Sequence, residues 1–168
     1  QMVMSLYSLT LGFVSSGVTN ALSKLISSAR ARGDYNKLSG YYRYALLFSM
    51  GLSLLFGIIF AVLSNQISSF QGFSEGNISY MLLAILLPLG ALIGIFRGIV
   101  QGYENMTPTA ISQLIEQVVK FAFGLFFAYI LGKDNIGAGV FGAFLGIIIS
   151  EIFATVYLTF IITRKVKI

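Results

Sequence analysis

Three charged residues stand inside long apolar stretches of the sequence, where charge is costly. Glu116 and Lys120 are four residues apart in the stretch 108–131, and Glu151 is the only charge in the stretch 136–163. Side chains four apart on a helix meet, so Glu116 and Lys120 can form an ion pair. Two interpretations stay open for this pair: a proton- or substrate-responsive site inside a helix bundle, or a structural ion pair that orients the helix. Glu151 is either a protonated buried acid or the partner of a base on another helix, for example Lys120.

Small polar side chains recur along the first apolar segment. Spaced three to four residues apart, they share one face of a helix; they are Ser5, Ser8, Gly12, Ser15, Ser16, Thr19 and Ser23. Asn20 and Lys24 extend this face. Such a face either lines a water-filled cavity or lets helices pack closely, with the hydroxyls bonded to their own backbone. Both interpretations stay open, and Ser8, Ser16 and Thr19 are the candidate cavity residues.

The residue types that are absent narrow the possible chemistry. The sequence contains no Cys and no His, which excludes disulfides, thiolate or imidazole metal sites, and Ser-His-Asp or Cys-His catalysis. No two of its six acidic residues are close enough in sequence to indicate a carboxylate metal cluster. We therefore expect no catalytic residue, no metal and no cofactor, and a protein that is not an enzyme. The net charge of +5 is compatible with nucleic acid, but the positions of the basic residues fit membrane topology better.

The composition indicates the kind of element that carries these residues. Of the 168 residues, 57% are hydrophobic and only 10% are charged, far from the roughly 25% charge of soluble domains. A bilayer core is crossed by about 20 mostly apolar helical residues. The sequence predicts one all-α membrane domain, 1–168, a polytopic bundle of five transmembrane helices at 2–26, 44–63, 78–100, 108–131 and 136–163.

Local signals support helices that pack tightly. Thr107 before Pro108 predicts a hydroxyl N-cap, and Gly33 followed by Asp34 predicts a break and a cap for the next helix. Small residues repeat every fourth position in two segments, which allows close approach of helix backbones. The two ridges are Gly90, Gly94, Gly98 and Gly102 in the third span, and Ala138, Gly142, Gly146, Ser150 and Ala154 in the fifth.

Basic residues indicate the orientation in the membrane. If the five spans alternate, nine basic residues fall on one side and only Lys133 lies in the opposite connections; the nine are Lys24, Arg30, Arg32, Lys37, Arg43, Arg97, Arg164, Lys165 and Lys167. The positive-inside rule then places the loops 27–43 and 97–107 and the C-terminus in the cytoplasm. The N-terminus would lie outside, which is natural if an earlier span is missing, so we expect the chain to be a fragment of a longer membrane protein.

Two stretches resemble a known family. Residues 96–117 read FRGIVQGYENMTPTAISQLIEQ, while 17–25 read GVTNALSKL and 33–35 read GDY. The first stretch is similar to the signature FRGxxQGxxNMxPTAxSQxxEQ of polysaccharide-type transporters in the multidrug/oligosaccharidyl-lipid/polysaccharide exporter superfamily. Within it, the lipid II flippase and stage V sporulation protein B branch is the nearest match. The motif positions carried over are Asn20, Lys24, Arg97, Glu104, Asn105 and Glu116.

The resemblance implies a fold and a function. Such transporters have about fourteen helices in two lobes, and the five spans would be the second to sixth helices of the N-terminal lobe of this MATE- and MurJ-like fold. The implied function is to flip or export a lipid-linked cell-wall precursor, lipid II, across the bacterial plasma membrane by alternating access. Lys24 and Arg30 near the cytoplasmic mouth would attract its pyrophosphate. The missing first helix, the second lobe and membrane lipid would be further partners.

Other functions remain open from the sequence. One is an exporter of other lipid-linked polysaccharide units, and another is a drug or cation antiporter. A non-transporting membrane scaffold subunit is the alternative from a different class, and it predicts a dry bundle interior.

Overall fold

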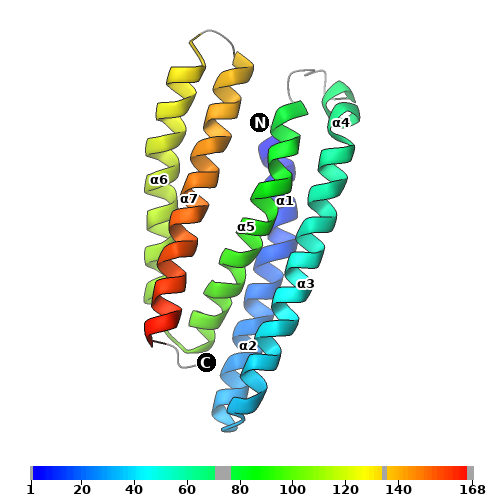
Figure 1. Ribbon diagram of the computed structural model, residues 1–168. Coiled ribbons are helices and arrows are strands. Elements are labelled where there is room, and N and C mark those ends of the chain that lie inside the picture. The colour runs from blue at the N-terminus through cyan, green and yellow to red at the C-terminus, as the bar shows by residue number, and fades with distance from the viewer. Residues whose placement is uncertain (1, 71–76, 134–135, 166–168) are drawn as a thin grey trace.

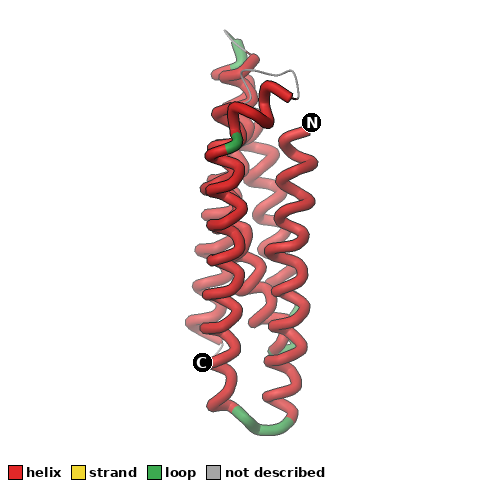
Figure 2. Tube along the Cα trace, turned by 90° about the vertical axis from the view of Figure 1, so that its right-hand side faces the viewer, coloured by secondary structure: helices red, strands yellow, loops and turns green. Residues whose placement is uncertain are grey.

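The computed structural model describes residues 2–70, 77–133 and 136–165, and within these ranges it contains helices and no strand (Figure 1). The helices are α1 (Met2–Leu11), the π-helical turn η1 (Gly12–Ser16), α2 (Gly17–Ala31), α3 (Tyr35–Val62), α4 (Ser64–Phe70), α5 (Asn77–Gly102), α6 (Thr107–Leu131) and α7 (Ile136–Lys165). The predicted all-α helix bundle is confirmed. Figure 2 shows that the long helices run roughly along one direction.

Four helices are long and apolar enough to cross a bilayer among the residues described: α3, α5, α6 and α7. They correspond to the last four predicted spans, although α3 begins at Tyr35 rather than at residue 44. The first predicted span is helical but divided into α1, η1 and α2, each shorter than a membrane span, so its crossing of the bilayer remains a prediction. The short helix α4 was not predicted.

The π turn η1 is held by hydroxyl groups. Ser49 on α3, which is fully buried, donates a hydrogen bond to the carbonyl oxygen of Val14 at 3.2 Å. Thr19 Oγ1 lies 2.8 Å from the carbonyl oxygen of Ser15. A π turn departs from regular helical bonding and is often found at functional sites. The bonds from Ser49 and Thr19 stabilise this irregular backbone.

Helix α5 packs along the whole first helical segment through its glycines. A Cβ atom added to Gly98 would lie 2.9 Å from the carbonyl oxygen of Thr19, and one on Gly102 would lie 2.6 Å from Ile26 Cβ. Added Cβ atoms on Gly90 and Gly94 would meet Leu11 and Ser15. The first predicted small-residue ridge is therefore confirmed as a contact surface.

The second predicted ridge also forms a helix contact. A Cβ on Gly142 would lie 2.6 Å from the carbonyl oxygen of Phe127, and one on Gly146 would meet the backbone of Gly124. Helices α6 and α7 thus form a closely packed antiparallel pair, visible at the left of Figure 1. Helix α7 also lies along α5, whereas α6 contacts α5 through few residues.

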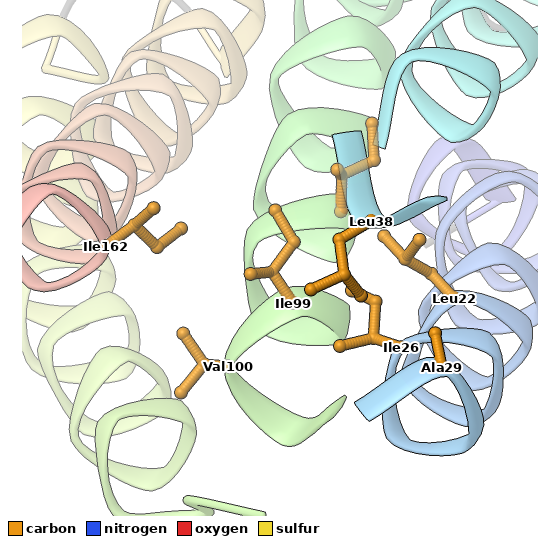
Figure 3. Close-up of a cluster of buried hydrophobic side chains, with 8 residues drawn as sticks. Leu22, Ile26, Ala29, Leu38, Ile99, Val100 and Ile162 are labelled. Atoms are coloured by element: carbon orange, nitrogen blue, oxygen red, sulfur yellow. The ribbon is translucent and has the colours of Figure 1, made fainter. Parts of the chain in front are cut away.

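Apolar side chains close the lower end of the bundle as drawn in Figure 1. Figure 3 shows this cluster, in which residues of α2, α3, α5 and α7 meet. Its members are Leu22, Ile26, Ala29, Leu38, Ile95, Ile99, Val100 and Ile162. The cluster fixes the ends of α2, α3 and α5 relative to one another, next to the two turns described below.

Two turns at this end share one backbone design. In the first, Gly33 has φ 74°, and its N–H and that of Asp34 donate to the carbonyls of Arg30 and Ala29. In the second, Glu104 has φ 60°, and its N–H and that of Asn105 donate to the carbonyls of Gln101 and Val100. This is the Schellman arrangement, which usually places glycine at the position of positive φ.

The turns differ from the sequence predictions in three details. Both predicted loops are shorter in the structure: 27–43 is reduced to 32–34, because α2 continues to Ala31 and α3 begins at Tyr35, and 97–107 is reduced to 103–106, because α5 continues to Gly102. The N-cap of α6 is Met106 rather than the predicted Thr107, and the Thr107 hydroxyl makes no capping bond. Instead, the backbone N–H of Thr107 donates to Asn105 Oδ1 at 3.3 Å. Asp34 is at the N-cap of α3 but makes no side-chain cap. Its carboxylate accepts a bond from Lys37 at 2.8 Å, which lowers the pKa of Asp34 below its usual value.

Candidate functional site

A polar hollow of about 260 Å³ opens between the first helical segment, α5 and α6. It is lined by Ser15, Ser16, Thr19, Asn20, Arg97, Gln101 and Gln113. The structure therefore brings three sequence candidates, Ser16, Thr19 and Asn20, together with a fourth, Arg97. We call this space the polar hollow.

The hydroxyl of Thr19 ties one wall of the polar hollow to α5. Its Oγ1 lies 2.7 Å from the carbonyl oxygen of Gly94 and 2.8 Å from that of Ser15. One hydroxyl proton is shared between the two acceptors, as in three-centre hydrogen bonds. Thr19 thus packs α2 against α5 and also lines the polar hollow. Close helix packing and a cavity wall, the two interpretations of the hydroxyl face, are therefore compatible at this residue.

Beside the polar hollow, one acid bridges two bases. Glu116 Oε2 accepts a bond from Arg97 at 2.8 Å, and Glu116 Oε1 accepts one from Lys120 at 3.2 Å. Arg97 Nε also donates to Ser112 Oγ at 3.0 Å, and Ser112 donates onward to the carbonyl of Thr109. The side chains of Arg97 and Glu116 are only 17% and 16% exposed, and that of Lys120 is 31% exposed.

The predicted Glu116–Lys120 pair is present, and the part of Arg97 in it is the new feature. Arg97 lies inside α5, five residues before the helix ends, rather than in the predicted loop 97–107. Two cations and one carboxylate leave this cluster with one net positive charge next to hydroxyl and amide groups. Such a set suits a phosphate-type anion or a sugar, because guanidinium and hydroxyl groups bind both through hydrogen bonds.

A metal ion has no comparable set of ligands in the part of the chain that the structure describes. Within those residues no group of three acidic side chains comes together. The polar hollow itself is lined by hydroxyl, amide and guanidinium groups.

Comparison with known proteins decides the family. The model of a family described as "Polysaccharide biosynthesis protein" matches residues 1–168. The chain belongs to this family. It is 32% identical over 144 residues to the stage V sporulation protein B of Bacillus subtilis (strain 168), covering 84% of this chain and 28% of that protein. It is 28% identical over 171 residues to the lipid II flippase MurJ of the same organism, covering 88% of this chain and 31% of that protein.

The chain spans less than a third of the length of either curated relative. No solved structure matches it significantly. For this member of the polysaccharide biosynthesis protein family, the geometry of the site thus comes from the chain's own structure.

Three of the carried-over motif positions of this family member lie outside both the polar hollow and the charge cluster beside it. Lys24 is exposed near the lower end of α2. Glu104 and Asn105 are exposed and form the turn between α5 and α6, so their contribution seen in the structure is to the backbone of that turn.

The remaining candidates also lie apart from the hollow. Ser8 is exposed on α1 and donates to its own helix, at the carbonyl of Ser5. The guanidinium of Arg30 stacks 4.5 Å from the ring centroid of Tyr103, across from the lower end of α5. Glu151 is 2% exposed on α7 and its Oε1 lies 3.7 Å from where a Cβ on Gly90 would stand. It therefore belongs to the α5–α7 contact.

Proposed function

We propose that this chain is part of a transporter that carries a lipid-linked oligosaccharide across the bacterial plasma membrane by alternating access. Lipid II is the specific substrate that we propose. The polar hollow beside the Arg97–Glu116–Lys120 cluster is the observation that carries the proposal. Family membership supports it, because the family is described as a polysaccharide biosynthesis protein and one relative of the chain is named a lipid II flippase.

The physical need for such a hollow is clear. The pyrophosphate and sugars of a lipid-linked precursor cannot enter hydrocarbon unaided, because unsatisfied polar groups cost several kcal/mol each. The hydroxyls of Ser16 and Thr19 and the amide of Asn20 offer bonds to sugar hydroxyls. Arg97 offers a cation to the phosphates. A second lobe, beyond the residues of this chain, would supply the rest of the cavity.

The proposed orientation follows from charge. The turns 32–34 and 103–106 and the end of α7 share one end of the bundle (Figure 1). Most basic residues lie towards that end, including Lys24, Arg30 and Arg97. We therefore assign this end to the cytoplasm by the positive-inside rule. Lys24 and Arg30 would draw the pyrophosphate towards the bundle when the substrate loads.

The test uses neighbouring residues at the junction of η1 and α2. Single cysteines replace Ser16 and Asn20, which line the polar hollow, and Gly17 and Ala21, which face another side of α2. They are placed in the full-length protein, made free of other cysteines. We expect a membrane-impermeant thiol reagent to label positions 16 and 20 and to leave 17 and 21 unlabelled. Lipid II should slow labelling at 16 and 20.

The outcomes separate the alternatives. Protection of positions 16 and 20 by other lipid-linked saccharides, but not by lipid II, would show that lipid II is not the substrate and would still support a transporter. Protection by drug-like cations would favour the antiporter. Equal resistance at all four positions would contradict the hollow and favour a scaffold. Recovery of chemically unchanged substrate in the opposite leaflet distinguishes transport from an enzyme reaction.

A further inference from the structure

A second, larger hollow of about 550 Å³ lies between α2 and α3. Its floor contains the small residues Gly17, Ala21 and Ala45, and large side chains stand along its rim. Among them Phe13, Tyr44 and Phe48 are strongly exposed, so the rim projects on either side of a low floor. We call this space the apolar hollow.

The floor of the apolar hollow is open, in contrast to the other small-residue surfaces. A Cβ on Gly17 would have no atom within 4 Å. By comparison, one on Gly98 would lie 2.9 Å from the backbone of α2, and one on Gly142 would lie 2.6 Å from that of α6. The ridges on α5 and α7 are filled by neighbouring helices, whereas this floor is covered by nothing within the described chain.

Cations lie in line with the apolar hollow at its lower end. Lys37 is four residues before Tyr41 of the lining and one helical turn below it, and Arg32 follows Leu25 of the lining by seven residues, or two turns. Both Lys37 and Arg32 are exposed, and Lys37 also donates to the Asp34 carboxylate at 2.8 Å. The segment 24–43 around them contains five basic residues and a single acid, Asp34. The groove is therefore apolar along its length and cationic at its mouth.

We propose that the apolar hollow binds one hydrocarbon chain of an anionic phospholipid, whose phosphate lies at Arg32 and Lys37. A flexible chain fits a low floor between aromatic rims. The cations at the mouth favour a lipid over a protein helix, because a helix packed on Gly17 and Ala21 gains nothing from them. An anionic headgroup gains about fivefold in affinity for each Lys or Arg near the membrane surface. This site is independent of the proposed transport function.

Tryptophan quenching in the full-length protein tests this site. Phe48→Trp places a fluorophore on the rim of the apolar hollow, and Phe121→Trp places one on the exposed face of α6, outside the hollow. Both are made in a background whose other tryptophans are replaced by phenylalanine. The proteins are reconstituted in phosphatidylcholine vesicles with rising fractions of brominated phosphatidylglycerol or of brominated phosphatidylcholine.

We expect phosphatidylglycerol to quench Phe48→Trp at an at least fivefold lower fraction than phosphatidylcholine does, with no difference at Phe121→Trp. Joint replacement of Arg32 and Lys37 by Gln should remove the preference, and Ala21→Phe should remove it by filling the floor. Equal quenching by both lipids would overturn the proposal. So would quenching at position 121 with none at position 48, because another part of the full-length protein would then cover the hollow.

Discussion

One helical segment, residues 12–31, separates the two hollows, and they are built differently. The polar hollow joins side chains from η1 and α2, α5 and α6, which are distant in sequence. The apolar hollow is formed with α3, the next helix along the chain. Ser16 and Asn20 face the first, and their neighbours Gly17 and Ala21 face the second. A helix can thus present water-compatible and lipid-compatible surfaces on separate sides, provided that its polar side is supported by other helices.

The helices that border each hollow are also connected by turns of the same kind. The helices beside the apolar hollow, α2 and α3, are connected through Gly33, and α5 and α6 beside the polar hollow are connected through Glu104. Both residues have positive φ. The difference in residue type indicates that the turn near the polar hollow carries backbone strain that the other turn avoids.

The largest expected difference concerns the packed and the open sides of α2. Gly98→Leu forces a side chain against the backbone of Thr19, which cannot rotate away, so we expect a loss of about 3 kcal/mol in stability. Gly17→Leu meets open space and should change stability by less than about 0.5 kcal/mol. Unfolding of the full-length protein in detergent measures both. Similar losses for the two variants would show that the apolar hollow is filled.

The next effect concerns the charge cluster of the polar hollow. Glu116→Gln leaves two cations inside the bundle without their carboxylate, and we expect a loss of about 2 kcal/mol, moderated by their partial exposure. Lys120→Gln keeps the shorter Arg97–Glu116 bond and should cost about 1 kcal/mol less. Thermal unfolding of both variants gives the comparison. A larger loss of stability for Lys120→Gln than for Glu116→Gln would contradict the view that the Arg97–Glu116 pair is the stronger of the two.

Part of the fold behind these two predictions could be predicted from the sequence. Long apolar runs with at most two charged residues each predicted four helices that could span the membrane, because hydrocarbon disfavours charge wherever a helix crosses it. They did not locate the helix ends: α3 begins at Tyr35, since its polar first turns continue the helix beyond the apolar core. The spacing of four predicted the Glu116–Lys120 bond, which depends on one helix alone.

These sequence patterns could not predict contacts between separate helices. Arg97 and Glu116 are on different helices, and no local period relates them. The apolar hollow likewise depends on how α2 lies against α3, and the polar hollow on how α2 and α6 are placed around α5. The bond from Ser49 to η1 was also not predicted, although the sequence contains a repeat of small residues that could have indicated a packing face: Ser49, Ser53 and Gly57 are spaced four apart. All three are buried in the structure.

That serine pair provides a smaller test of the helix between the hollows. Ser49→Ala removes the hydrogen bond to the Val14 carbonyl in η1, and we expect a loss of about 1 kcal/mol. Ser53 is equally buried but bonds within its own helix to the Met50 carbonyl, so Ser53→Ala should be nearly neutral. Unfolding free energies are compared, with cysteine labelling at position 16 as a second measurement. If η1 aligns the polar side, labelling should change only in Ser49→Ala.

The smallest expected effect concerns the two turns. Glu104→Gly removes the strain of a non-glycine residue at positive φ, which exceeds the added entropy of the unfolded chain, and should stabilise the protein by about 0.5 kcal/mol. Gly33→Ala introduces the same strain and should destabilise it by a similar amount. If Glu104 acts only through its turn, the glycine variant should keep full transport of lipid-linked substrate in proteoliposomes. A stabilised protein with reduced transport would instead assign the Glu104 carboxylate a direct part in moving the substrate, because a purely conformational role cannot separate the two measurements.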